Sequence, residues 1–199
     1  MTDSLAWYVA RSSGLVAWAL LASGVFLGLA LSTRVMGTRP RPKWLLDLHR
    51  FVGGLALVFV AVHVAGLMMD HYVHFGIQEV LLPLASSYRP LPVAAGIVGL
   101  YLLVAIELTS LAMHRIPKRW WRTVHSTSFV LFVLTSVHVV SGGTDASKTP
   151  VKVLALVLSA GFVFLVTYRW LAPRRAVPQS SRGANMPTMD VPAEIERVA

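Results

Sequence analysis

The sequence contains no cysteine, and only 14% of its 199 residues are charged. The absence of thiols excludes disulfides, thiolate-held iron–sulfur clusters, cysteine zinc sites and a cysteine nucleophile. Ordinary soluble domains carry roughly 25% charged residues, so this chain is poor in charge, whereas 55% of its residues are hydrophobic. The composition therefore excludes both a disordered chain and an ordinary soluble domain, and the length suits one domain.

Long apolar runs account for this composition. A helix needs about 20 apolar residues to span a bilayer, and five runs approach that length. They cover residues 14–31, 51–69, 91–113, 123–140 and 153–168. They lack the alternation of strands, so the sequence predicts an all-α integral membrane bundle of five transmembrane helices. The shorter apolar segment 76–88 predicts an interfacial or re-entrant stretch on the outer side.

The distribution of basic residues predicts the orientation. Lysine and arginine number 18 against 9 acidic residues. Fourteen of these 18 follow the first, third and fifth runs, which places those segments in the cytoplasm by the positive-inside rule and argues against nucleic-acid binding. We expect residues 1–13 to be an extracytoplasmic N-terminal segment. We expect the polar, proline- and serine-rich residues 172–199 to form a disordered cytoplasmic tail.

Four histidines lie within or directly beside two of the apolar runs. His63 lies in the second run and His49 lies two residues before that run, 14 positions from His63, whereas His125 and His138 lie 13 positions apart in the fourth run. These spacings correspond to about 21 and 20 Å along helices that run in the same direction. We therefore expect His49 to face His125 near the inner side and His63 to face His138 near the outer side. Two imidazoles that face each other across a bundle suit the two axial positions of a haem iron.

The spacing of 13 leaves the two histidines of the fourth run about 140° apart on an ideal helix. A kink, a local change of winding, or haems that enter from different directions would reconcile this with two pairs. The plainer interpretation is that intramembrane histidines make hydrogen bonds between helices. A cofactor-free transporter or assembly protein, with the histidines as proton relays, is the alternative from another functional class.

Residues beside the histidines fit a flat macrocycle. Gly53 lies one turn after His49, and Gly66 lies one turn after His63. Because glycine has no side chain, both positions would leave space for a porphyrin to lie against the helix. Small residues in membrane helices also serve helix packing. Arg50 and Arg122 lie near the inner histidines, where they would pair with haem propionates.

Other ionisable residues have two interpretations each. Glu107 in the third run would relay protons, or would pair with Arg50 or Arg115 near the interface. Asp145 follows the fourth run and would lie near the outer haem or simply serve a turn.

Asp70, His71 and His74 cluster beyond the second run. They would bind a metal such as iron, or would form a solvated loop.

The two histidine segments, LHRFVGGLALVFVAVH and VHSTSFVLFVLTSVH, resemble the haem-ligand helices of the ferric reductase-like transmembrane domain. That domain is shared by ferric reductases, NADPH oxidases and the haem subunit of the bacterial methionine sulfoxide reductase system. The resemblance covers residues 14–171. It implies that His49, His63, His125 and His138 are the axial ligands of two b-type haems, in a bacterial inner-membrane protein.

This resemblance also implies a function. We expect a transmembrane cytochrome that carries electrons from a cytosolic flavin-dependent reductase or membrane quinol to an acceptor outside, such as ferric iron or a partner reductase. The mostly polar residues that follow the last run contain no glycine-rich dinucleotide fingerprint. We therefore expect the haem-bearing component of an oxidoreductase that lacks its own flavin and NAD(P)H domain.

Overall fold

Helices form all the regular structure of residues 2–33, 43–70 and 75–171, which are the residues that the computed structural model describes. The helices are α1 (Thr2–Thr33), α2 (Lys43–Met69), α3 (Ile77–Leu81), α4 (Pro90–Leu111), α5 (Lys118–Ser126), α6 (Ser128–Gly142) and α7 (Thr149–Leu171). Five stretches are long and apolar enough to cross a membrane: Leu5–Ser32, Lys43–Met69, Pro90–Leu111, Lys118–Gly142 and Thr149–Leu171. The predicted all-α, five-span architecture is confirmed, and the protein is an integral, multi-pass membrane protein.

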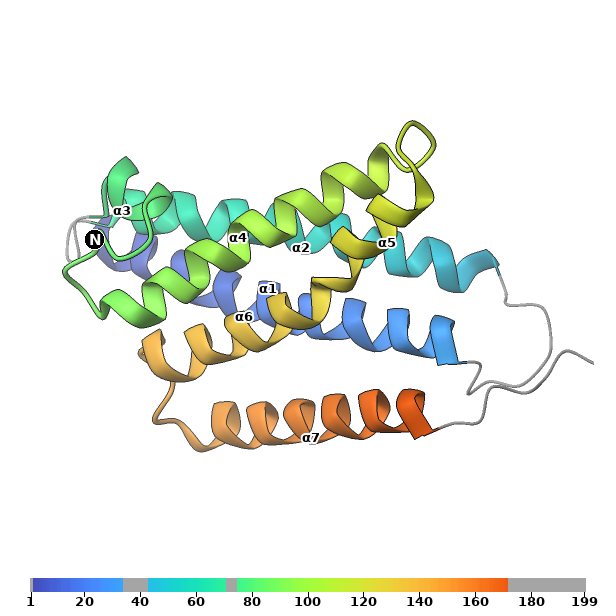
Figure 1. Cartoon of the computed structure of the whole chain (residues 1–199). Coiled ribbons are helices and arrows are strands. Elements are labelled where there is room, and N and C mark those ends of the chain that lie inside the picture. Colours follow the sequence, from blue (N-terminus) through green and yellow to red (C-terminus); the bar gives the residue numbers. More distant parts are fainter. Residues whose placement is uncertain (1, 34–42, 71–74, 172–199) are drawn as a thin grey trace, which may run out of the picture.

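The spans alternate in direction along the bundle (Figure 1). Helices α1, α4 and α7 run one way, and α2 and the α5–α6 stretch run the other way. One end of the bundle carries α3 and is called the α3 end; the opposite end carries α5 and is called the α5 end. Helix α2 packs chiefly along α1, and α6 packs chiefly along α4. The two histidine-bearing stretches are thus each held by a different neighbouring helix.

A small apolar core joins four of the spans. Leu21 of α1, Ala56 of α2, Leu103 of α4 and Leu131 of α6 pack into one buried cluster. A second cluster connects α1 and α6 to aromatic and aliphatic side chains of α7. Helix α7 has no buried residue of its own, and many apolar side chains of the bundle point outward. Outward apolar side chains are the expected surface of a protein that faces lipid.

Helix α1 is longer than the first apolar run. It begins at Thr2, whereas the run begins at residue 14, so Arg11 belongs to a membrane-capable helix. Segment 76–88 does not cross the bundle: it contains the five-residue α3 and a turn in which Leu84 has a positive φ of 71°. The predicted tail 172–199, and His71 and His74, lie outside the described residues.

The fourth span is broken between its two histidines. Helix α5 ends at Ser126 and α6 begins at Ser128. At the break, the backbone N–H of Thr127 donates to the carbonyl of Val124 at 3.0 Å, an i→i−3 bond that tightens the turn. The Thr127 hydroxyl donates to the same carbonyl at 2.7 Å. The 13-residue spacing left three ways to bring His125 and His138 into two pairs with the histidines of α2, and this local change of winding is one of them.

Candidate functional site

The first histidine pair lies toward the α3 end and consists of His63 on α2 and His138 on α6. Their ring centres are 6.3 Å apart and their planes are inclined by 80°. Nδ1 of His63 lies 2.6 Å from the carbonyl oxygen of Ala10, and Nδ1 of His138 lies 2.8 Å from that of Pro92. Because a carbonyl only accepts, both Nδ1 atoms donate and both Nε2 atoms keep a free lone pair. That is the tautomer an imidazole needs to bind a metal through Nε2.

The second pair lies toward the α5 end and consists of His49 on α2 and His125 on α5. Their ring centres are 6.0 Å apart and their planes are inclined by 71°. The hydroxyl of Ser110 is 3.5 Å from Nδ1 of His125, and the Trp121 ring stacks on this histidine at 5.1 Å. Nδ1 of His49 is buried without a hydrogen-bond partner among the described residues. This pair is therefore less firmly oriented than the first.

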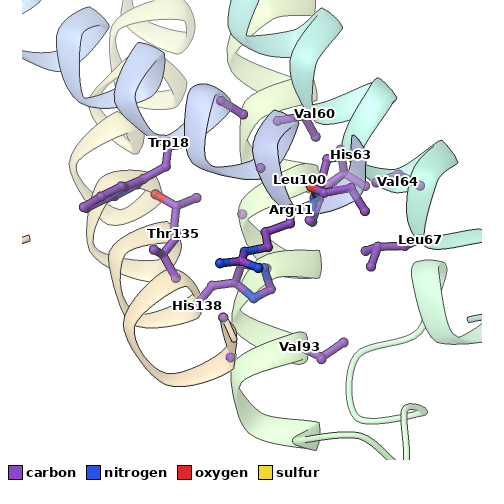
Figure 2. Close-up of a pocket in the computed structure, with 18 of the residues that line it drawn as sticks. Arg11, Trp18, Val60, His63, Val64, Leu67, Val93, Leu100, Thr135 and His138 are labelled. Carbon is purple, nitrogen blue, oxygen red and sulfur yellow. Dashed lines mark hydrogen bonds between the residues drawn. The ribbon is translucent and has the colours of Figure 1, made fainter. Parts of the chain in front are cut away.

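A cavity of about 240 Å³ opens beside the α3-end pair. Figure 2 shows it between helices α1, α2, α4 and α6, with His63 and His138 among the residues that line it. Apolar side chains such as Val60 and Leu100 make up much of the wall. A predominantly apolar cavity with a few convergent polar groups is the usual form of a cofactor pocket.

An ion pair forms part of the lining of this cavity. The Nε and Nη2 groups of Arg11 on α1 each donate to a carboxylate oxygen of Asp145, in the turn between α6 and α7. The guanidinium also lies over the ring of Trp7, 4.6 Å from its centre. The sequence gave Asp145 two interpretations, near the outer haem or in a turn, and gave no role to Arg11. The missed signal was a charged residue close to an apolar run.

Two predicted arginines lie on the surface of the α5 end. Arg50 and Arg122 are exposed, and Arg50 lies 3.9 Å from Asp47. Glu107 takes part in neither of the two ion pairs found among the described residues. The expected pairing of Glu107 with Arg50 or Arg115 is therefore wrong, because the Glu107 carboxylate lies against α2 instead: a Cβ on Gly53 would come within 2.6 Å of its Oε1.

Both predicted glycines of α2 lie in tight contacts with neighbouring helices. Gly53 accommodates the side chain of Glu107 from α4. Gly66 lies against the backbone of α1, since a Cβ there would come within 2.9 Å of the Ala10 nitrogen. These contacts explain the small residues through helix packing, which is the usual role of glycine in membrane bundles.

The chain thus has the architecture of a multi-pass membrane bundle with two histidine pairs between its helices, one toward each end. Its residues 13–136 match the model of the family described as ferric reductase like transmembrane component. The matched segment covers most of the chain and includes three of the four paired histidines; the chain belongs to this family. Neither the curated proteins nor the solved structures gave a significant match.

Domains of this family are generally haem-binding, so we asked whether the paired histidines fit a haem. An imidazole nitrogen lies about 2 Å from its metal, so two rings on opposite sides of one metal have centres about 6 to 6.5 Å apart. The observed separations are 6.0 and 6.3 Å. No cluster of three or more ligating side chains occurs in the described part of the chain, and a haem requires only two. The residues fit the group.

Proposed function

We propose that this protein is a transmembrane b-type cytochrome with two haems, each held by one cross-helix histidine pair. The observation that carries the proposal is the presence of two such pairs, with ring separations of 6.0 and 6.3 Å, on the same two helical stretches. His49 with His125 would hold one haem, and His63 with His138 would hold the other. His49 and His63 are 14 positions apart, which corresponds to about 21 Å between the two proposed sites along α2.

The paired imidazoles also indicate the chemistry. Each haem would be held by two histidines, His49 with His125 and His63 with His138, and a haem held in this way would supply reversible one-electron transfer. The apolar helices around the sites exclude water and provide a medium of low dielectric constant. Hydrogen bonds from His63 and His138 to backbone carbonyls fix the ring orientation.

The direction across the membrane follows from charge. Among the described residues, basic side chains such as Lys118, Arg119 and Arg122 gather at the α5 end, which supports a cytoplasmic location for that end, with the N-terminus outside and the C-terminus inside. The family resemblance, and not the charge, suggests a bacterial inner membrane. Electrons would enter through His49 and His125 from a cytosolic flavin-dependent reductase or membrane quinol. They would leave through His63 and His138 to ferric iron or a partner reductase outside. Residues 14–171 would form the haem-binding domain.

Haem content of single histidine variants tests the proposal. We expect two haems per chain in the purified protein, measured by reduced-minus-oxidised absorption and by haem extraction. His63→Ala and His49→Ala should each remove one haem, and the double variant should remove both, because each histidine belongs to a different site.

His114→Ala is the matched control. His114 is exposed in the turn between α4 and α5 and belongs to neither pair, so both haems should remain. A colourless wild-type protein would favour the cofactor-free alternative. Two haems that survive both single substitutions would contradict the ligand assignment.

A further inference from the structure

Gly14 of helix α1 lies directly against the Nδ1 side of the His63 ring. The carbonyl that receives the His63 Nδ1 proton belongs to Ala10, and Gly14 lies one turn later on the same face of α1. A Cβ on Gly14 would come within 2.7 Å of His63 Nδ1. Real Cβ atoms essentially never approach that closely. The imidazole can therefore reach the Ala10 carbonyl only because residue 14 has no side chain.

Helix α4 repeats this arrangement behind His138. The accepting carbonyl belongs to Pro92, and Gly96 again lies four residues later. A Cβ on Gly96 would come within 2.8 Å of His138 Nδ1 and 2.9 Å of its Cε1. Helices α1 and α4 thus share one pattern: a carbonyl that accepts from a histidine Nδ1 is followed one turn later by a glycine against the same imidazole.

Small residues recur 14 positions further along each helix, behind the α5-end pair, although no hydrogen bond to an accepting carbonyl is found there among the described residues. On α1 this position is Gly28, where a Cβ would lie 3.4 Å from Cε1 of His49. On α4 it is Ser110, whose hydroxyl lies 3.5 Å from Nδ1 of His125. Fourteen residues return a helix to nearly the same face, only about 40° away. One face of α1 therefore backs both histidines of α2.

We infer that Gly14, Gly96, Gly28 and Ser110 are positioning residues that hold the backs of the four histidines and so fix the geometry of the proposed haem sites. This inference rests on the proposed function, because it assigns these residues a role toward the same ligands. The contact distances also show how strictly each of these positions requires a small side chain. Gly14 and Gly96 leave no room for a methyl group, whereas the contact at Gly28 is at the limit of ordinary van der Waals distance. The α3-end site is consequently the more strictly dependent on glycine.

Alanine substitutions in the full-length protein test the inference. Gly14→Ala and Gly96→Ala should each displace one imidazole and lower the haem content from two per chain to one. Gly28→Ala should keep both haems, and a small shift in the reduction potential of one of them should be the only change. The optical spectrum and the EPR signal of the remaining ferric low-spin haem should then show that the α5-end site stays intact.

Gly54→Ala is the matched control. Gly54 lies on α2 about 140° around the helix from His49, and apart from its chain neighbours and the backbone of its own helix, no atom lies within 4 Å of where its Cβ would be. It should keep two haems with unchanged spectra. The inference is overturned if the wild type binds two haems and Gly14→Ala and Gly96→Ala behave like Gly54→Ala.

A double-mutant cycle gives a measurement that does not depend on haem. Gly14→Ala should lower the unfolding temperature in detergent, and this loss should disappear in a His63→Ala background, where the added methyl group meets no imidazole. An equal loss in both backgrounds would overturn the inference. A wild type without haem would refute the proposed function, while the cycle would still decide whether Gly14 positions His63.

Discussion

The ion pair between Arg11 and Asp145 should contribute measurably to stability. It joins α1 to the turn after α6, across 134 residues of sequence. The side chain of Arg11 is 31% exposed and that of Asp145 is 10% exposed. Asp145→Asn keeps the shape of the side chain but removes its charge, and it leaves the guanidinium of Arg11 beside the cavity without a counter-charge.

The magnitude follows from this intermediate burial. Breaking a fully buried pair costs about 3–5 kcal/mol, whereas an exposed pair contributes about 0.2–1 kcal/mol. For this partly exposed, bidentate pair we expect Asp145→Asn to lower the free energy of unfolding by about 2 kcal/mol. The loss can be measured by denaturant titration in detergent, with helix content as the signal. Arg11→Met combined with Asp145→Asn should recover part of it, because the double variant leaves no unpaired charge.

Asp47→Asn is the matched control, since it removes the same charge from the exposed Asp47–Arg50 pair. Those side chains are 70% and 58% exposed and lie 3.9 Å apart. We expect a change below about 0.5 kcal/mol. The reasoning is refuted if Asp145→Asn costs no more than Asp47→Asn, or if the double variant is as unstable as the sum of the two single variants.

Three further substitutions test the packing of the bundle by the same unfolding assay. Gly66→Ala should cost about 1–3 kcal/mol, because its methyl group would meet the backbone of Ala10 at 2.9–3.0 Å; a neutral result would contradict the close packing of α1 and α2. Ser136→Ala should cost about 1–3 kcal/mol, because it removes the hydroxyl that accepts from the indole N–H of Trp18 at 3.1 Å, and Trp18 is only 2% exposed. Ser136→Thr, which keeps the hydroxyl, is the control. Glu107→Gln should change stability by less than about 0.5 kcal/mol, because Glu107 takes part in neither ion pair of the described residues, and a large loss would reveal an essential carboxylate.

The order of the spans and the two histidine pairs were predictable from the sequence. Apolar runs near 20 residues favour the helix as the spanning structure, since backbone polar groups in lipid must be hydrogen-bonded within the protein and a helix achieves this within a single segment. The spacings of 14 and 13 predicted similar separations along the helix axes through the rise per residue. A repeat of 14 between Gly14 and Gly28, and between Gly96 and Ser110, was also visible in the sequence. The role of these small residues could not be predicted, because the sequences of α1 and α4 alone do not show that histidines of other helices pack against them.

The tertiary structure decided the features that depend on two distant segments. The break at Thr127 is one of three solutions that the sequence left open, and local propensity did not choose among them. Glu107 lies against Gly53 instead of pairing with an arginine, and Arg11 meets Asp145. Hydropathy and periodicity describe one helix at a time, whereas these contacts depend on how each helix is rotated about its axis and how closely it approaches its neighbours. In a bilayer that rotation is set by side-chain packing between helices, which only the assembled bundle provides.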